Sequence, residues 1–487
     1  MKKSFRILAL FLAVIMMVSV FVACNGGEGT TDETTVNNED TNGSGDETTG
    51  EVMPDVEKKN YDATFFLSVM TDVNPMDRYW VEESNDDVLS AALFERQEKV
   101  RNYLGVEVYA TPTAGYQEYT EAFITAVKNR SGGVDTLLTH VSSGVSGLIT
   151  EGVLTPFEEM EGIDLDADYW NQEFMDALSI NDHYLLGFSD FNILYTYVVA
   201  YNKDLLVKYE DKLDKSVYDM VDDYEWTLQQ FCDIAKLGFI NNGSEDKNQY
   251  GLTGLQWVPW CGFLEAAGVN LVEMNDQGTY ELSYNNEIYY ETTQGVVNLL
   301  SDIAAAEYTN VDFGSTGPAT VPFESNRSLM TLASTNELPA YLNHDIDFGV
   351  LPYPVYASNQ KEYRSLQWGG YMAIPRHLEN KAMVGETLEM LSFFSEDVKT
   401  AYYQKLLGKQ VGEDPNDRRM LEIIWDSVCT DFGQTFDEVT GFCLYMLPSV
   451  TASPDKGGVS YAQYTKGRIS QSKGAIKAFF KKVDKNY

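Results

Sequence analysis

Three tryptophan-containing segments have the side chains that a carbohydrate site needs. Sugars present C–H patches on their ring faces and hydroxyls at their rims, so their sites combine flat aromatic rings with carboxylates or amides. Trp257 and Trp260 lie in a Pro-containing turn, where two indoles are not expected to be buried together in one sheet. Trp80 lies in a loop region, and Trp368 precedes Gly369-Gly370, whose missing side chains would let backbone approach a ligand. A core position is the alternative for each indole alone, but together they favour a carbohydrate or oligosaccharide.

Polar side chains along the chain could bind sugar hydroxyls. Ser142 and Ser143 follow an expected strand and offer hydroxyls or helix N-terminal amides, with simple helix capping as the alternative. Asp72 and Glu324 are further carboxylate candidates. An amino acid or peptide ligand stays open as an alternative, because its carboxylate needs a cation. The chain could supply one from Arg78, Arg327 or Arg364.

Motifs for catalysis, cofactors and metals are weak. No phosphate-binding loop, dinucleotide fingerprint or His-Glu-x-x-His occurs, and 144–147 lacks the spacing of a Gly-x-Ser-x-Gly elbow. Asp164, Asp166 and Asp168 alternate like the start of a calcium loop, but Tyr169 replaces the required glycine. We therefore expect no metal, no cofactor and no enzyme activity. A glycoside hydrolase stays an alternative, since its two carboxylates could be any pair among 74 acids.

Short apolar runs alternate with amphipathic segments after residue 60. Residues 63–70, 106–109 and 134–139 are strand-like, while 88–104 and 120–128 have helical periodicity. This β-α-β-α-β order predicts an α/β fold with a parallel sheet covered on both faces. Ligands of such sheets bind beyond the carboxyl ends of the strands. The first candidate loops are therefore Thr71–Asn74, Ala110–Thr113 and His140–Gly144.

A series of spaced motifs follows from Val134 onward. The main ones are Leu154 to Phe157, Tyr201 to Leu205, Glu225 to Leu228, Phe348 to Pro354 and Gly369 to Pro375. In this order they resemble the extracellular solute-binding proteins of ABC importers, family 1, the maltose-binding-protein-like group. One departure is Asn181-Asp182, which replaces the family's Gly-Gly before Tyr184. We expect Asn and Asp to adopt the left-handed conformation there instead.

The resemblance implies a two-lobed α/β body of the periplasmic-binding-protein type II fold, with a ligand cleft between the lobes. The first lobe is expected at 61–188 plus 326–367, and the second at 195–325 plus 375–487. Ligand contacts on both lobes would stabilise a closed form and shift a hinge equilibrium. Asp190, on the first crossover, is the best candidate for a hydroxyl-binding carboxylate, with a capping or turn role as the alternative.

The first 60 residues indicate export and anchoring. Positive residues precede an apolar run that stops at Cys24, the pattern of a signal peptide over 1–23. Phe21 to Cys24 resembles a bacterial lipobox, which implies lipidation of Cys24; an ordinary secreted protein cut nearby is the alternative. Residues 24–60 read as a disordered acidic tether, because they cannot bury enough apolar surface to fold. We expect the protein to be located at the outer face of a cell membrane, with a tether whose length suits a Gram-positive-type envelope.

Charge and cysteines limit the partners further. The formal charge of −39 argues against nucleic acid or an anionic membrane surface as partner. Besides Cys24 the chain has Cys232, Cys261, Cys429 and Cys443, which allow two disulfides in three pairings or free buried thiols.

These observations predict a monomeric, lipid-anchored protein that captures a carbohydrate and delivers it to ABC transporter permease subunits. A surface glycan-capture or sensor protein without its own permease would have the same site and differ only in its partner. The extracellular glycoside-cleaving enzyme is the less favoured alternative, because the family resemblance disfavours it.

Overall fold

The computed structural model describes residues 53–487 except 73, 114, 132, 142, 194, 256, 276–279, 284–286, 313–320, 408–413, 442–445 and 453–457. The signal peptide, Cys24, Ser142 and Cys443 lie outside the described residues. The end of the expected tether, residues 53–60, is described and packs on the body. Val56 is 6% exposed and its carbonyl accepts a hydrogen bond from the Tyr103 hydroxyl at 2.8 Å. Lys59 forms an ion pair with Glu386. The tether prediction is therefore wrong for this last stretch.

The first sheet confirms the predicted parallel core. Its strands lie in the order β2 (Val106–Thr113), β1 (Ala63–Met70), β3 (Thr136–His140), β13 (Gly370–Pro375) and β4 (Leu154–Thr155). β1 pairs in parallel with β2 and β3, whereas β13 runs antiparallel to β3 and β4. Pairing of β1 with β2 continues to Thr113, so the expected loop Ala110–Thr113 is strand instead.

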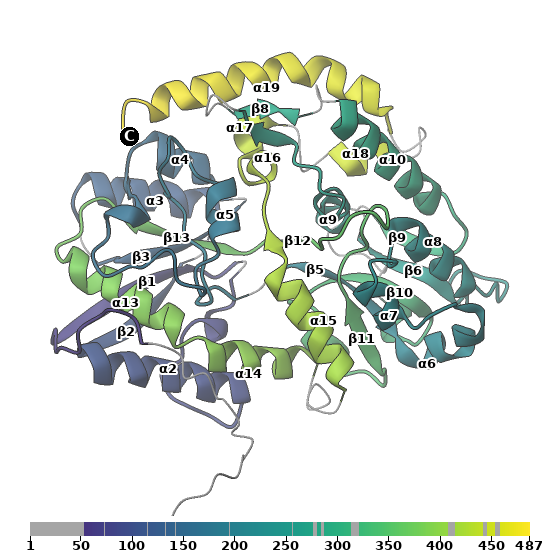
Figure 1. The fold of residues 1–487 in the computed structure, drawn as a ribbon, viewed down its shortest axis with the longest axis horizontal. Coiled ribbons are helices and arrows are strands. Elements are labelled where there is room, and N and C mark those ends of the chain that lie inside the picture. The colour runs from purple at the N-terminus through teal and green to yellow at the C-terminus, as the bar shows by residue number, and fades with distance from the viewer. Residues whose placement is uncertain are drawn as a thin grey trace, which may run out of the picture. The chain divides into compact units, whose positions relative to one another are not determined.

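Helices cover this sheet as their periodicity predicts. In α2 (Val88–Leu104), Leu89, Leu93 and Val100 are fully buried, and Asp87 caps the first turn by accepting from two backbone amides. The other helices near this sheet are α3 (Gln117–Lys128), α4 (Val145–Thr150), α13 (Lys381–Phe393) and α14 (Glu396–Leu407). α13 and α14 pack against α2 (Figure 1). The prediction that all of 375–487 belongs to the second lobe is therefore wrong for these two helices.

The second sheet is mixed. Its order is β11 (Phe348–Leu351), β5 (Tyr197–Asn202), β10 (Ser328–Ser334), β6 (Tyr250–Leu255) and β9 (Thr309–Asp312). β5 runs antiparallel to both β10 and β11, while β6 is parallel to β10 and β9. Because β10 and β11 bond to β5, the assignment of 326–367 to the first lobe is wrong.

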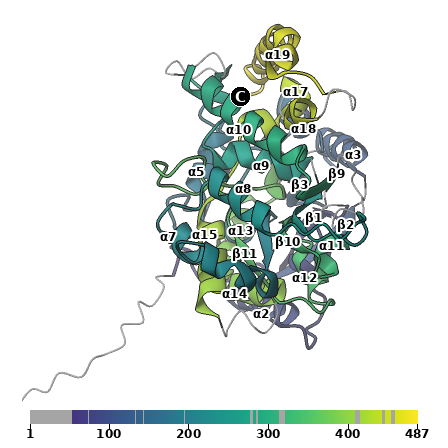
Figure 2. The same cartoon turned by 90° about the vertical axis from the view of Figure 1, so that its right-hand side faces the viewer.

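The helices α8 (Leu228–Leu237), α9 (Val258–Ala266) and α10 (Glu287–Ala304) lie on the second sheet's side. α8 and α9 pack on β6, and both also contact α10, whose label stands above theirs in Figure 2. α15 (Pro415–Asp426) packs against β11. The long α19 (Tyr461–Val483) contacts α4 near the first sheet and β8 and α18 near the second.

Short elements complete the fold. They are η1 (Met76–Arg78), η2 (Phe157–Glu159), α5 (Gln172–Ala177), α6 (Lys203–Leu206), η3 (Val207–Lys212), α7 (Val217–Asp222), β7 (Val272–Met274), β8 (Tyr280–Leu282), α11 (Val321–Glu324), α12 (Leu338–Tyr341), β12 (Ser365–Leu366), β14 (Val428–Cys429), α16 (Phe432–Thr435), α17 (Asp437–Thr440) and α18 (Met446–Thr451).

Two segments cross between the sheets side by side. Residues 188–196 lead into β5, and 365–369 lead back to β13. The Trp368 amide donates to the Tyr195 carbonyl at 2.7 Å, and the Thr196 hydroxyl donates to the Leu366 carbonyl at 2.6 Å. β12, in the second segment, also pairs with β14. These two segments are called the crossings.

The structure bears on one further local prediction and on one question that the sequence left open. Asn181 and Asp182 have φ of 52° and 62°, so the turn before Tyr184 is left-handed as expected. Cys232 and Cys429 are buried free thiols rather than disulfide partners. Across the part of the chain that the structure describes, no helix is both long enough and apolar enough to cross a membrane.

Candidate functional site

Four aromatic rings from distant parts of the chain meet where β3 ends. His140 closes β3, opposite Gly370 of β13. Its ring lies 5.8 Å from that of Trp368 and 6.4 Å from those of Tyr195 and Tyr116. We call His140, Tyr116, Tyr195 and Trp368 the aromatic site. Tyr116 and His140 come from the first lobe, whereas Tyr195 and Trp368 come one from each crossing.

The crossings hold two of these rings in place. Besides the bond between Trp368 and Tyr195, the Gln367 side chain accepts from the Tyr195 amide at 3.1 Å. A Cβ on Gly369 would lie 2.5 Å from the Gln367 Nε2 atom, and one on Gly370 would lie 3.1 Å from Asn74 Oδ1. A Cβ on Gly369 would also lie 2.9 Å from the Tyr195 Cβ atom, so this glycine allows the two crossings to pack closely, a reason that the sequence did not suggest.

Two carboxylates border the aromatic site. Asp72, after β1, accepts from the Gly115 amide, and its charge adds to partial burial in raising the pKa of Tyr116. Glu337, after β10, accepts from the Ser334 amide at 2.6 Å. Burial, followed by the charge of Glu337, raises the pKa of Tyr195. One acid from each lobe thus acts on a tyrosine of the site, and acids paired with exposed aromatic faces are the groups that bind hydroxyl-rich ligands.

His140 is neutral in the folded protein. It is 1% exposed, and burial lowers its pKa to about 3 despite a hydrogen bond with the Trp368 backbone. A neutral ring can pack against aromatic rings without a charge that would require desolvation. We interpret His140 as the floor of the aromatic site.

This burial predicts a pH dependence of stability. Between pH about 6.5 and about 3 the unfolded chain binds a proton that folded His140 excludes, so stability is full above this window and falls as pH falls through it. Between pH 7 and pH 5 the free energy of unfolding should fall by about 2 kcal/mol more in the unmodified protein than in the His140→Gln variant. Urea unfolding at both values measures this, with exposed His344→Gln as control. Equal losses in the protein and in His140→Gln would contradict the burial of His140.

The other predicted site residues lie elsewhere or have local roles. Trp80 donates from its indole to the Val108 carbonyl at 2.8 Å and so caps the edge of β2. Trp260 is 0% exposed within the first turns of α9, which is helix rather than the expected turn. Trp257 precedes this helix and is partly buried. Ser143 donates to the His140 carbonyl at 2.6 Å and thereby fixes the turn after β3.

Asp190 lies beside α15 and α14, not beside the aromatic site in any described contact. Its carboxylate accepts from the Trp425 indole at 3.4 Å. Burial raises its pKa to about 6, against the opposing charge of Lys399. The weaker candidate Glu324 is in α11. The three arginines considered for a charged ligand already bond to protein groups, since Arg78 donates to Tyr402, Arg327 to Asn248 and Arg364 to Glu265.

Sequence reasoning missed Tyr116, Tyr195 and Glu337. His140 does fall in a predicted loop, and Tyr116 follows β2 closely, so the rule of strand carboxyl ends points to both. Tyr195 lies on the crossing before β5, and Glu337 follows β10, a strand that the sequence analysis assigned to the first lobe. Within the described residues, no group of three or more His, Cys, Asp or Glu side chains is placed to hold a metal ion.

Comparisons with known proteins identify the family. The sequence profile of the bacterial extracellular solute-binding proteins matches residues 92–408. No curated protein matches the chain. The GacH receptor of Streptomyces glaucescens, solved unliganded and with acarbose, is 13% identical with a TM-score of 0.53, over 87% of this chain and 98% of that one. The maltotriose-binding protein of Thermus thermophilus, bound with maltotriose, is 15% identical with a TM-score of 0.53, over 85% and 100%.

A third solved structure is the MalE domain from Bdellovibrio bacteriovorus bound to maltotriose. It is 14% identical with a TM-score of 0.51, over 85% of this chain and 100% of that one. At such identities the likeness shows the fold, which is two-lobed and α/β. The profile match covers more than half of the chain. The protein therefore belongs to the bacterial extracellular solute-binding proteins.

Proposed function

We propose that this protein captures an oligosaccharide at the aromatic site and delivers it to the permease of an ABC transporter. The observation that carries the proposal is the convergence of Tyr116, His140, Tyr195 and Trp368 at the end of β3, with Asp72 and Glu337 at the border. Aromatic faces stack on sugar rings, and carboxylates bind hydroxyls. The structural neighbours named above bind maltotriose or acarbose, which supports the same ligand class here.

Residue roles follow from position and exposure. Tyr116 is 41% exposed, so its ring is accessible to a ligand. Tyr195 and Trp368 contribute one ring from each crossing. Asp72 and Glu337 are the hydroxyl acceptors, one from each lobe. Of the residues proposed from sequence, Trp257 and Gly369-Gly370 stay candidates at the second lobe and the crossing.

Capture by hinge closure is part of the proposal. Both crossings carry site residues, so a change in the angle between the sheets changes the spacing of the rings. Arg78, before α2, donates to Asn336, which follows β10. This contact joins the two lobes beside the crossings. A ligand that contacts Asp72 and Glu337 at once stabilises the closed form over the open one.

We also propose that the chain is lipid-anchored at Cys24 on the outer face of the membrane and acts as a monomer. The family is extracellular, and the pattern of 1–23 is that of an export signal. A chain with a sensor role and no permease would have the same aromatic site. Transport assays in cells that lack the permease distinguish the importer role from the sensor role, because sugar uptake requires the permease and sugar binding does not.

Ligand binding is tested by thermal unfolding of residues 53–487, which form one compact unit. The panel contains mono- and oligosaccharides, amino acids and peptides. A ligand at 100 times its dissociation constant adds about 2.7 kcal/mol to stability and should raise Tm by a few degrees. We expect an oligosaccharide to do so and to be recovered intact by chromatography. A shift with amino acids or peptides only, or a sugar cut to shorter products, would contradict the proposal.

A further inference from the structure

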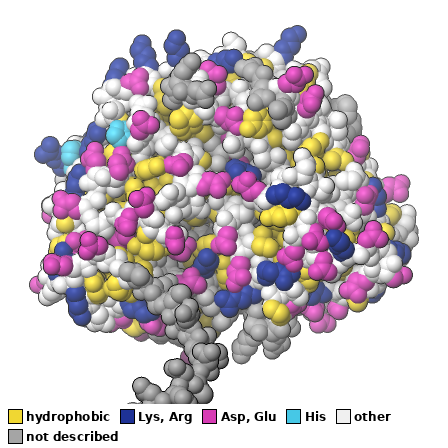
Figure 3. Space-filling model, viewed as in Figure 1, with side chains coloured by type: hydrophobic (Ala, Val, Ile, Leu, Met, Phe, Trp, Pro, Cys, Tyr) yellow, Lys and Arg dark blue, Asp and Glu magenta, His cyan; other side chains and the backbone are white. Residues whose placement is uncertain are grey.

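The C-terminal helix carries positive charge on a strongly negative protein. Residues 461–487 contain seven Lys and Arg and a single acid, Asp484, in a chain whose formal charge is −39. All seven cations are exposed. Figure 3 shows dark-blue side chains projecting along the upper edge, where α19 lies in Figure 1. The net charge of the chain therefore does not describe this surface.

These cations have no ion-pair partner among the residues that the structure describes. Elsewhere the lysines pair readily, as Lys203 does with Asp417 at 2.5 Å and Lys215 with Asp223 at 2.6 Å. No ion pair within 4.0 Å involves a cation of 461–487. These cations are therefore not neutralised by direct ion pairs among the described residues, although the charge of Lys482 acts on Glu151.

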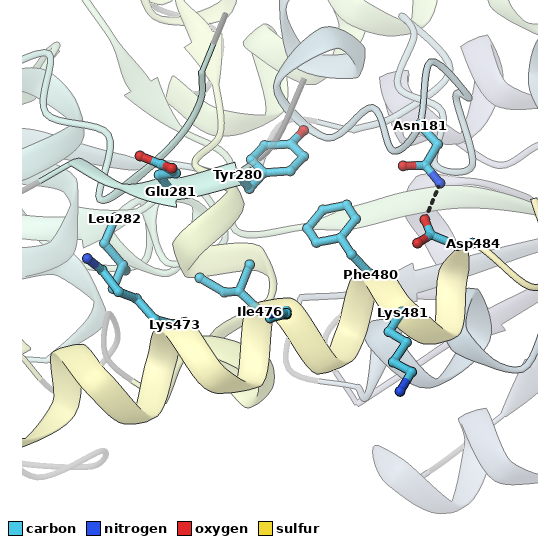
Figure 4. Close-up of a pocket in the computed structure, with 10 residues that line it drawn as sticks. Asn181, Tyr280, Glu281, Leu282, Lys473, Ile476, Phe480, Lys481 and Asp484 are labelled. Atoms are coloured by element: carbon cyan, nitrogen blue, oxygen red, sulfur yellow. Dashed lines mark hydrogen bonds between the residues drawn. The ribbon is translucent and has the colours of Figure 1, made fainter. Parts of the chain in front are cut away.

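Four of the lysines form one row along the helix. Lys466, Lys473, Lys477 and Lys481 are separated by seven, four and four residues, so they share a face and span about 22 Å. We call them the lysine row. Its last three members border a cavity of about 650 Å³ that Tyr280 and the acids Glu281 and Asp484 also line. Figure 4 shows this cavity, in which the Tyr280 and Phe480 rings lie 5.4 Å apart.

The row is held rigidly. Ser460 and Gln463 form a capping box at the start of α19. At the other end the Asn486 side chain donates to the Thr150 carbonyl at 2.8 Å, and Phe479 and Val483 are buried. The spacing of the lysines is therefore preformed, and little ordering is needed on binding.

We propose that the lysine row binds a linear polymer of phosphate groups. A single row fits one strand, whereas a flat anionic membrane would also approach the acidic body and be repelled by it. Among the described residues, none of the large exposed hydrophobic side chains belongs to 461–487, so the exposed face of the lysine row presents charge rather than the apolar anchors that a specific protein interface uses. Lysine acts on phosphate as a point charge, without the paired geometry that arginine provides. Binding of this polymer holds the protein within a layer of phosphate-containing chains and leaves the aromatic site accessible to a sugar.

The test measures binding of long-chain sodium polyphosphate to residues 53–487 across salt concentrations. Neutralisation of four phosphates gives a slope of log K against log salt of about −3, so affinity should fall about 50-fold between about 50 and 200 mM salt. In Lys473→Gln/Lys477→Gln/Lys481→Gln one contact remains, and the fall should be about threefold. The sugar-induced shift in Tm should be unchanged in this variant.

A matched control removes the same charge elsewhere. Lys58, Lys208 and Lys247 are exposed and outside α19, and their triple Gln variant should keep the steep salt dependence of the unmodified protein. An equal loss of the salt dependence of polyphosphate binding in both triple variants would overturn the proposal, because it would mean that only the total charge of the protein matters. Absence of polyphosphate binding at low salt, or tighter binding of poly-L-glutamate or of phosphatidylserine vesicles, would overturn it as well.

Discussion

Replacement of Arg364 by Met should lower the free energy of unfolding by about 3–5 kcal/mol. Arg364 Nη2 lies 2.8 Å from an oxygen of Glu265, whose side chain is 0% exposed. The same guanidinium lies 3.1 Å from Glu173 of α5. Met fills a similar volume but leaves the Glu265 carboxylate buried without its counter-charge. Urea unfolding measures the loss.

An exposed pair is the control for this prediction. Arg418 contacts Glu422 at 2.8 Å, and both side chains are exposed. Arg418→Met should cost at most about 1 kcal/mol. Adding Glu265→Gln to Arg364→Met should recover part of the loss, because it removes the buried charge. If Arg364→Met cost no more than Arg418→Met, the buried pair would not contribute as the structure indicates.

Removal of aromatic rings from the site should weaken sugar binding. Tyr116→Ala and Trp368→Ala are each expected to reduce affinity by about 1–3 kcal/mol, or about 5- to 150-fold, since each removes a stacking face. Titration calorimetry with the sugar found by thermal unfolding measures this. Trp368 is 6% exposed, so its replacement also lowers stability. Tyr116 is 41% exposed, and its variant should keep the Tm of the unmodified protein.

Tyr290→Ala supplies the matched comparison. Tyr290 is 38% exposed on α10, and its ring lies 5.3 Å from that of Tyr461. Its removal should leave sugar affinity unchanged. Unchanged affinity in Tyr116→Ala and Trp368→Ala, or an equal loss in Tyr290→Ala, would contradict the assignment of the aromatic site.

The sequence predicts individual strands better than their partners. The runs behind β1, β2 and β3 are short, apolar and separated by amphipathic helices, so both their type and their parallel pairing follow from local pattern. The run behind β10 is also short and contains Leu329, Met330 and Leu332, and in the structure all its residues are buried. Its apolar run carries no information about which sheet it joins. The pairing of β10 with β5 depends on a connection of more than a hundred residues, and the lobe boundaries were wrong for that reason.

The site was harder to predict for a related reason. Tyr116, His140, Tyr195 and Trp368 are far apart in the chain, and only the crossings bring them together. Trp260 looks like a site residue by type, but α9 begins at Val258 with Pro259 in its first turn, and the indole is buried in the core. Trp80 has its indole bonded to the Val108 carbonyl on the edge strand β2. Residue type suggested the ligand chemistry, whereas position depended on tertiary contacts.

The most direct test of a carbohydrate site between the lobes is a crystal structure of residues 53–487 with the sugar that most raises Tm. We expect a sugar ring stacked on Tyr116 or Trp368, with its hydroxyls bonded to Asp72 and Glu337. A sugar bound at another surface, or an aromatic site that closes around a molecule without sugar rings, would contradict the account.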